Sequence, residues 1–227
     1  MNPGTTDISE AGLRLAGMID HTLLKPEAGF KDIERLCGEA LRYGFAAVCV
    51  NPAMLPVVVE KLAGSRIIPC TVTGFPLGAT TTPSKAYEAG EAAQSGAREV
   101  DMVLAVWAIK QKAYSTVLDD MKAVVRAAGS TCGVKVILET CLLTDEEKVT
   151  ACKLALDAGV RFVKTSTGLN CGGATTYDVA LMRATVGTRI GVKAAGGIKT
   201  RADAEAMVKA GATRIGTSSG ITIVSKP

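Results

Sequence analysis

The sequence predicts an α/β fold, a (β/α)8 or TIM barrel, organised as a single domain over residues 1–227. Helices that end at a glycine alternate with short apolar strands and polar loops along the chain. Eight predicted strands follow one another at a spacing of about 30 residues, the length of a βαβ unit. Eight parallel strands that alternate with helices favour a closed barrel. An open, doubly wound sheet is the alternative, but it would need fewer strands or a nucleotide-binding fingerprint, which this sequence lacks.

The predicted helices share an amphipathic pattern and a capping or stop signal. They lie close to residues 30–43, 82–96, 144–159 and 200–211, and a short N-terminal helical extension precedes them. In the first of these helices, apolar residues recur at helical spacing and Gly44 ends the helix. Thr144 and Glu147 form a capping box at the start of the third. The predicted strands are apolar runs that end near Asp20, Val50, Thr73, Leu104, Glu139, Thr165, Ala194 and Thr217.

Polar side chains stand where these apolar strands end. In a parallel barrel the carboxyl ends of all strands meet at one face, where chemistry gathers. The residues at this face include Asp20, Asn51, Gly74, Asp101, Glu139, Lys164, Lys193 and the loop 216–219. Side chains alternate along a strand, so Asp101 shares its face with Glu99, and Glu139 shares its face with Lys135. We therefore expect the charged residues to face the barrel axis, with a Glu99–Lys135 ion pair lower in the barrel.

Lys164 and Lys193 each end an apolar run, in strands where an ammonium group is costly to bury. If the two strands are neighbours, each lysine disfavours the protonated form of the other, and one can become a neutral amine near pH 7. A neutral, buried amine is what a Schiff-base enzyme needs. Structural roles are the alternative. Either lysine could be purely structural, Asp101 could join the Glu99–Lys135 ion pair, and Asp20 could cap the turn that follows it.

Glycine-rich turns after the last two strands indicate a phosphate site. Gly196 and Gly197 follow the seventh strand, and the segment 216–220 follows the eighth. Barrels commonly bind a phosphate there with backbone N–H groups and a helix N-terminus. Ser218 and Ser219 can add hydroxyl donors. A glycine pair at 172–173 is a candidate third segment.

The composition argues against several classes of protein. The net charge is +4, and no basic cluster with interleaved aromatic residues indicates a nucleic-acid surface. Charges or glycines interrupt the apolar runs before they reach the length of a membrane span. The first residues lack the pattern of a signal peptide. Seven cysteines without a C-x-x-C pair favour a reduced, cytoplasmic compartment.

The histidine and the cysteines near strand ends are expected to have structural roles. His21 is the only histidine, and we expect it to pack or hydrogen-bond. One histidine does not favour a metal site, so no metal is expected. Cys49 and Cys141 lie near strand ends, but no histidine base is close in the pattern. We expect these cysteines to pack in the core or to lie near the site incidentally.

Several segments of this chain resemble the signature segments of one known family. They are Ile19-Asp-His-Thr-Leu-Leu24, Cys49-Val-Asn-Pro52, Asp101-Met-Val, Val163-Lys-Thr-Ser-Thr-Gly168, Val192-Lys-Ala-Ala-Gly-Gly-Ile198 and Arg214-Ile-Gly-Thr-Ser-Ser219. These segments span nearly the whole chain and resemble the signature segments of the 2-deoxyribose-5-phosphate aldolase family. The resemblance implies a cofactor-independent class I aldolase that cleaves deoxyribose 5-phosphate to acetaldehyde and glyceraldehyde 3-phosphate. It also implies a sugar-phosphate substrate and a homo-oligomer, either a dimer or a tetramer.

The same resemblance implies roles for individual residues. Lys164 is similar to the Schiff-base lysine, and Lys193 to the second lysine that lowers the pKa of the first and relays protons. Asp101 resembles the acid/base carboxylate, and Asp20 one that assists the relay or binds a substrate hydroxyl. The residues expected to bind the substrate or its phosphate are Asn51, Thr165, Gly168, Gly196, Gly197, Gly216, Ser218 and Ser219.

The chain departs from the family pattern at three places. Leu169 stands where some members have lysine, which removes one expected phosphate contact, and Ala195 replaces a serine. The sequence given ends at Pro227, without the tyrosine-ended tail that some members fold towards the active site, and this difference does not touch the expected Schiff base. Two alternative functions stay open: another class I sugar-phosphate aldolase, or a non-catalytic barrel that binds sugar phosphates.

Overall fold

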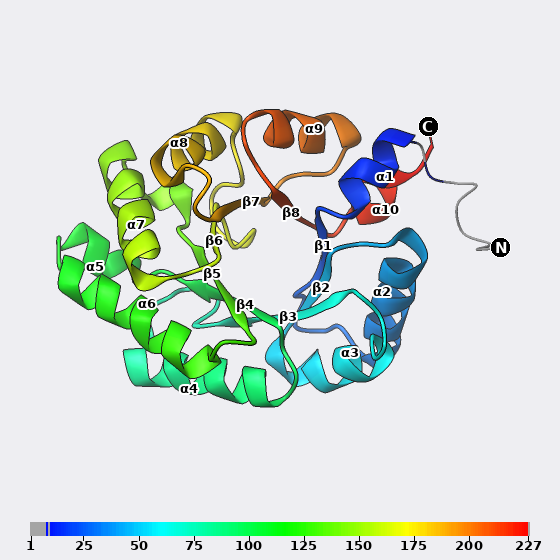
Figure 1. Cartoon of the computed structure of the whole chain (residues 1–227), viewed down its shortest axis with the longest axis horizontal. Coiled ribbons are helices and arrows are strands. Elements are labelled where there is room, and N and C mark those ends of the chain that lie inside the picture. The colour runs from blue at the N-terminus through cyan, green and yellow to red at the C-terminus, as the bar shows by residue number, and fades with distance from the viewer. Residues whose placement is uncertain (1–7, 9, 227) are drawn as a thin grey trace.

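A computed structural model describes residue 8 and residues 10–226, and its eight parallel strands close into a barrel in sequence order. Helices surround the strands (Figure 1), which confirms the predicted (β/α)8 fold. The strands are β1 Ile19–Leu23, β2 Ala47–Val50, β3 Ile68–Thr73, β4 Glu99–Val103, β5 Gly133–Ile137, β6 Phe162–Lys164, β7 Gly191–Ala195 and β8 Arg214–Thr217. Pairing of β8 with β1, in which Asp20 is the partner of Gly216, closes the barrel.

The helices lie on the outside of the barrel and pack against the strands. They are α1 Glu10–Ala16, α2 Phe30–Tyr43, α3 Leu55–Lys61, α4 Thr82–Gln94, α5 Val106–Lys110, α6 Tyr114–Ala128, α7 Asp145–Ala158, α8 Thr176–Val186, α9 Arg201–Lys209 and α10 Gly220–Val224. Two short 3₁₀ helices, η1 Pro52–Met54 and η2 Thr140–Leu142, follow β2 and β5. Helix α1 lies beside α10, near the labelled C-terminus (Figure 1).

Local signals fix the ends of several helices as predicted. Helix α2 covers 30–43 and ends at Gly44, whose φ of +69° is the left-handed conformation that glycine adopts without a steric penalty. At α7 the Thr144 hydroxyl accepts from the Glu147 N–H, and the Glu147 carboxylate accepts from the Thr144 N–H at 2.7 Å. This confirms the predicted capping box, which satisfies two N–H groups that lack partners inside the helix.

The strands separate an apolar layer from a charged interior. Val100, Met102 and Val136 lie in the large hydrophobic core between strands and helices, as alternation predicts. Inside the barrel the apolar cluster is small and includes Cys49 and Cys70. The rest of this interior holds the charged side chains described below. The fold therefore places charges where parallel strands, helices and backbone exclude water.

Alternation fails at one predicted position. Strand β5 ends at Ile137, and Glu139 has a φ of +56°, a left-handed conformation. This change of direction turns the Glu139 carboxylate toward the loop after β6, where it accepts from the Thr167 N–H at 3.2 Å and from its hydroxyl at 2.6 Å. Glu139 therefore holds a loop rather than extending the Lys135 face.

Among the described residues, no helix combines the length and apolar character needed to cross a membrane. Residues 1–7, in which the sequence predicts no signal peptide, lie outside the described residues, as does residue 9. Pro227 is outside them as well.

Candidate active site

Lys164 and Lys193 lie next to each other on adjacent strands. Strand β6 pairs with β7 in parallel, and the two lysines are direct partners in the register. Both side chains are almost completely buried, with residue exposures of 3% for Lys164 and 0% for Lys193. Their Nζ atoms donate to the same oxygen, Asp101 Oδ2, at 2.9 and 2.8 Å. The two nitrogens thus point into one compartment, as the sequence predicts.

Asp101, on β4, is the centre of this cluster. Besides the two lysines on Oδ2, Lys135 donates to Oδ1 at 2.7 Å. Burial alone would raise the pKa of Asp101, but the positive charges of Lys135, Lys164 and Lys193 outweigh burial and hold that pKa well below its usual value. Asp101 is therefore an ionised carboxylate whose two oxygens accept hydrogen bonds from three lysines.

Asp20, on β1, forms a second carboxylate beside Lys193. Its Oδ2 accepts a hydrogen bond from Lys193, and its Oδ1 accepts from Arg214 at 2.7 Å. Burial opposes ionisation, but Lys193, Lys135 and Arg214 together lower the pKa of Asp20. The side chain thus joins the charge cluster instead of capping the turn after β1.

The predicted Glu99–Lys135 ion pair is present, with an N–O distance of 2.7 Å. Arg214 adds to it, donating to Glu99 at 3.0 and 3.3 Å. Arg214 is not among the predicted site residues. Its signal was position: Arg214 opens β8 and shares a face with Gly216, which points it into the barrel. Lys135, expected only lower in the barrel, reaches Asp101 directly and links this ion pair to the two strand-end lysines.

The buried cluster carries one more positive than negative group. Its cations are Lys135, Lys164, Lys193 and Arg214, and its carboxylates are Asp20, Glu99 and Asp101. Burial disfavours the charged form of Lys193, but Asp101 and Asp20 raise its pKa above the usual lysine value. Lys193 is therefore protonated at neutral pH. Lys164 has one carboxylate partner, Asp101.

A cavity of about 390 Å³ opens above these lysines at the carboxyl ends of the strands. Lys164 lines it, whereas Lys135 and Lys193 lie below it. The cavity wall also includes the predicted residues Gly168, Gly196, Gly197, Gly216 and Ser218. Its volume is in the range of small-ligand sites. The structure thus brings the candidate Schiff-base lysine and most of the predicted phosphate residues together.

Three predicted substrate residues do not line this cavity. The Thr165 hydroxyl donates to the Ala195 carbonyl at 2.9 Å and so joins β6 to β7. Ser219 lines a neighbouring cavity of about 430 Å³ beside His21. Asn51 precedes η1. Their predicted contacts with substrate stay predictions.

Two lysines outside the predicted set of site residues line the cavity. Lys25 follows β1, and Lys199 follows the Gly196–Gly197 turn. Leu169, the position where some family members have lysine, also lies on the wall and is 64% exposed. Lys25 and Lys199 therefore supply positive charge to a cavity that lacks it at position 169. Both lie in loops beyond the ends of β1 and β7, where alternation along a strand gives no signal.

Cys49, Cys70 and Asp101 bring three possible metal-ligand atoms within 4.8 Å of one another. The environment does not suit a cation, because three lysines already donate to the Asp101 oxygens. Burial raises the pKa of Cys70 well above its usual value, so its thiol keeps the proton that a metal would displace. His21 lies outside this group, and the Glu39 carboxylate accepts a hydrogen bond from its Nε2 at 2.7 Å, in the expected hydrogen-bonding role.

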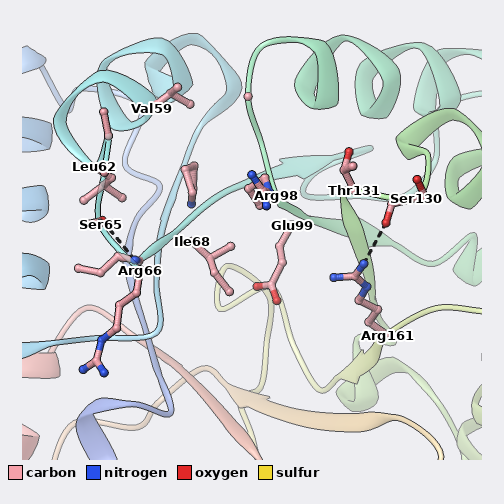
Figure 2. Close-up of a pocket in the computed structure, with 15 residues that line it drawn as sticks. Val59, Leu62, Ser65, Arg66, Ile68, Arg98, Glu99, Ser130, Thr131 and Arg161 are labelled. Carbon is pink, nitrogen blue, oxygen red and sulfur yellow. Dashed lines mark hydrogen bonds between the residues drawn. The ribbon is translucent and has the colours of Figure 1, made fainter.

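A larger cavity, of about 720 Å³, lies at the opposite end of the barrel, near the starts of β3 and β4. Figure 2 shows Arg66, Arg98 and Arg161 around it, with Glu99 pointing in from the strand. Arg161 donates to the Ser130 carbonyl at 3.1 Å. None of the strand-end lysines lines this cavity. Barrel enzymes carry their chemistry at the other end, where the smaller cavity lies.

Comparison with known proteins shows to which family the chain is similar. The family model described as DeoC/LacD family aldolase matches residues 15–226. Deoxyribose-phosphate aldolase from Listeria welshimeri is 56% identical over 213 residues, which cover 94% of this chain and 96% of the relative. The Carboxydothermus hydrogenoformans enzyme of the same name is 57% identical over 214 residues, covering 93% and 94%. The solved structure of a deoxyribose phosphate aldolase from Aeropyrum pernix, described as tetrameric, has a TM-score of 0.84 and 35% identity, covering 97% of each chain.

Proposed function

The chain belongs to the DeoC/LacD aldolase family, and we propose that it catalyses the reversible cleavage of 2-deoxyribose 5-phosphate to acetaldehyde and glyceraldehyde 3-phosphate. One observation carries the catalytic part of this proposal. Lys164 lines the cavity at the strand ends, while Lys193 and Asp101 lie directly behind it. A reactive amine, a cationic neighbour and a carboxylate are the groups that Schiff-base chemistry requires.

Lys164 attacks the substrate aldehyde as a neutral amine. Loss of its proton removes the excess positive charge of the buried cluster, because three cations, Lys135, Lys193 and Arg214, then remain with three carboxylates. The nitrogen adds to C1, and water leaves to give an iminium. Removal of the proton from the C3 hydroxyl then breaks the C2–C3 bond, and the iminium accepts the electron pair to form an enamine.

Asp101 and Lys193 move the protons of these steps. Asp101 contacts both lysines, so it can pass a proton between them and the substrate without a large movement. Asp20 is the second carboxylate that accepts a hydrogen bond from Lys193 and keeps this lysine charged. Protonation of the enamine at C2 and hydrolysis of the resulting iminium release acetaldehyde and restore the Lys164 amine.

The substrate phosphate binds at the turns after β7 and β8. Gly196 and Gly197 have φ values of +92° and +80°, which expose backbone N–H groups without a Cβ in the way. Ser218 adds a hydroxyl, and Lys25 and Lys199 add positive charge. Asn51, Thr165 and Ser219 complete the proposed set, acting around this cavity rather than on its wall.

We also propose that the protein is a cytoplasmic homo-oligomer, a dimer or a tetramer. A relative described as tetrameric supports oligomerisation. Large exposed hydrophobic side chains, including Tyr87 and Trp107, are the kind of surface that subunit contacts cover. Sedimentation velocity measures this directly, and a species of monomer mass at all concentrations would contradict it.

Kinetics of the Lys164→Arg variant test the function. Wild type is expected to cleave 2-deoxyribose 5-phosphate, and the variant to lose all measurable turnover, because a guanidinium cannot form the iminium. Circular dichroism should show the variant folded. Lys110→Arg, at an exposed ion pair with Glu147, is the matched control and should keep activity.

Two outcomes would overturn the proposal. Wild type that cleaves only other sugar phosphates would be another class I aldolase. Wild type that binds sugar phosphates without cleaving them would be a non-catalytic barrel.

A further inference from the structure

Two exposed cysteines from different loops lie side by side at the mouth of the barrel. Cys141 is in η2, after β5, and Cys171 is in the loop between β6 and α8. Their Sγ atoms are 3.2 Å apart. The other five cysteines, all in the described part of the chain, are buried. Cys141 is therefore not a core residue, contrary to the first of the two roles expected from the sequence.

The backbone permits this approach because residue 172 has no side chain. A Cβ at Gly172 would lie 2.7 Å from Cys141 Cβ, so only glycine allows the loop to pass there. A disulfide has an S–S length of about 2.05 Å, so a shift of about 1 Å would join the two sulfurs. Rotation about the side-chain torsions and a small loop movement are enough for that shift.

The loop that carries Cys171 forms part of the active-site cavity. Its first residue beyond β6 that faces the cavity is Thr167, which Glu139 holds through hydrogen bonds of 3.2 and 2.6 Å. Its far end is held by the Ala174 N–H, which donates to the Gly196 carbonyl at 3.0 Å. Gly168 lines the cavity between these anchors. Cys171 thus lies between the two anchors, and its side chain meets η2 through the thiol–thiol contact with Cys141.

The pair does not behave as a ready metal ligand. Burial and the hydrogen bond with Cys171 raise the pKa of Cys141 to about 11. Its sulfur therefore remains a thiol at neutral pH, which disfavours both metal binding and direct attack of Cys141 on a peroxide, because both need a thiolate. Of the two sulfurs, Cys171 is the one placed for the first reaction with an oxidant, and Cys141, 3.2 Å away, is placed to close the disulfide.

We propose that Cys141 and Cys171 form a dithiol modification site, which a peroxide converts to a disulfide that restrains the active-site loop. One thiol takes an oxygen atom from the peroxide as the O–O bond breaks, which gives a sulfenic acid and a first water. The second thiol displaces the hydroxyl as a second water, and the S–S bond forms. Two thiols and one hydrogen peroxide thus give one disulfide and two waters.

The disulfide acts on substrate binding, an effect that rests on the proposed function. It pulls the loop toward η2 and shifts the Gly168 segment of the cavity wall. Lys164 itself is fixed by β6 and by its bond to Asp101. We therefore expect the KM for 2-deoxyribose 5-phosphate to rise by about five-fold, the loss of one hydrogen bond. The kcat is expected to change by less than about two-fold, because the reacting lysines stay in place.

Peptide mapping and kinetics after peroxide treatment test the site. Without reduction, trypsin should release residues 136–148 and 165–183 as one linked species, lighter by two hydrogen atoms than the sum of the free peptides. Dithiothreitol should separate the peptides and restore the KM. Cys141→Ser and Cys171→Ser should each lose the linkage and the change in KM. Cys132→Ala, at the residue before β5, keeps both thiols and should respond as wild type.

Separate peptides, each heavier by oxygen atoms, would overturn the proposal, and so would a linked species whose KM equals that of the reduced enzyme. A reduced enzyme without aldolase activity would instead refute the proposed function. In that case the linked peptides would still decide whether the two thiols form the disulfide.

Discussion

The two carboxylate oxygens of Asp101 accept hydrogen bonds from three lysines. Lys135 occupies Oδ1, and Lys164 and Lys193 share Oδ2. These three contacts of the buried carboxylate are charge-assisted, which makes such hydrogen bonds short and strong, and the Cys70 thiol adds a longer contact of 3.5 Å to Oδ1. The same geometry places a proton acceptor against both candidate catalytic lysines, so one residue supports the charge cluster and the proposed chemistry.

The Asp101→Asn variant tests the contribution of this carboxylate to stability and to catalysis. The substitution leaves four buried cations against two carboxylates. We expect a loss of about 3 to 5 kcal/mol of unfolding free energy. We also expect kcat to fall by about 10²- to 10⁴-fold, the usual contribution of a general acid or base. Urea unfolding and steady-state kinetics measure the two effects.

Glu99→Gln is the control for Asp101→Asn. Glu99 contacts Lys135 and Arg214 but neither strand-end lysine. Glu99→Gln should lose stability and keep most of its kcat. An Asp101→Asn enzyme with the kcat of wild type would contradict the role given to Asp101.

Strands β6, β7 and β8 together position the reactive groups. The register pairs Lys164 with Lys193 and Ala195 with Gly216. Gly216 lies against the Lys193 side chain: a Cβ there would be 2.9 Å from Lys193 Cε and 2.9 Å from Ala195 Cβ. A glycine expected to bind phosphate thus also makes room for the second lysine.

The Gly216→Ala variant tests that packing. The added methyl group must displace Lys193 from Asp101, so we expect kcat to fall by about ten-fold or more, as for other small misplacements of catalytic groups. Gly38→Ala, in helix α2 with no atom within 4 Å of the new Cβ, is the matched control and should keep full activity. Equal kcat values for the two variants would show that Gly216 does not position Lys193.

Sequence patterns predict elements well where local and tertiary signals agree. The alternation of apolar strands and capped helices predicts the barrel, and strand ends predict Asp20, Asp101, Lys164 and Lys193 as neighbours. Glu139 departs from alternation because of its left-handed φ, a property of a single residue that the pattern does not contain. Lys25 and Lys199 could not be assigned to the cavity because loop shape, rather than periodicity, places their side chains.

At the scale of the whole molecule, the barrel interior is a buried ion cluster surrounded by an apolar shell. The carboxylates Asp20 and Asp101 have lowered pKa values despite burial. Lys135 and Lys193 have raised pKa values, also against the effect of burial. Folding therefore favours the charged form of all four groups, which couples the stability of the fold to pH at both ends of the scale.

This coupling predicts a plateau of stability between about pH 5 and pH 10. A carboxylate with a lowered folded pKa stabilises the fold above its unfolded pKa, so stability falls as acid protonates Asp20 and Asp101. A lysine with a raised folded pKa stabilises the fold below its unfolded pKa, so stability is lost as pH rises through the folded pKa. Urea unfolding at pH 3, 7 and 11 measures both limbs. Equal midpoints at pH 3 and pH 7 would contradict the cluster.

The most direct measurement of the central claim is the mass of the protein after acetaldehyde and borohydride at neutral pH. The reduced imine should add one two-carbon group, and peptide mapping should place it on Lys164. The Lys193→Met variant should form that adduct much more slowly, because the cationic neighbour that favours the free amine is gone. Addition to another lysine, or no addition at all, would contradict the account.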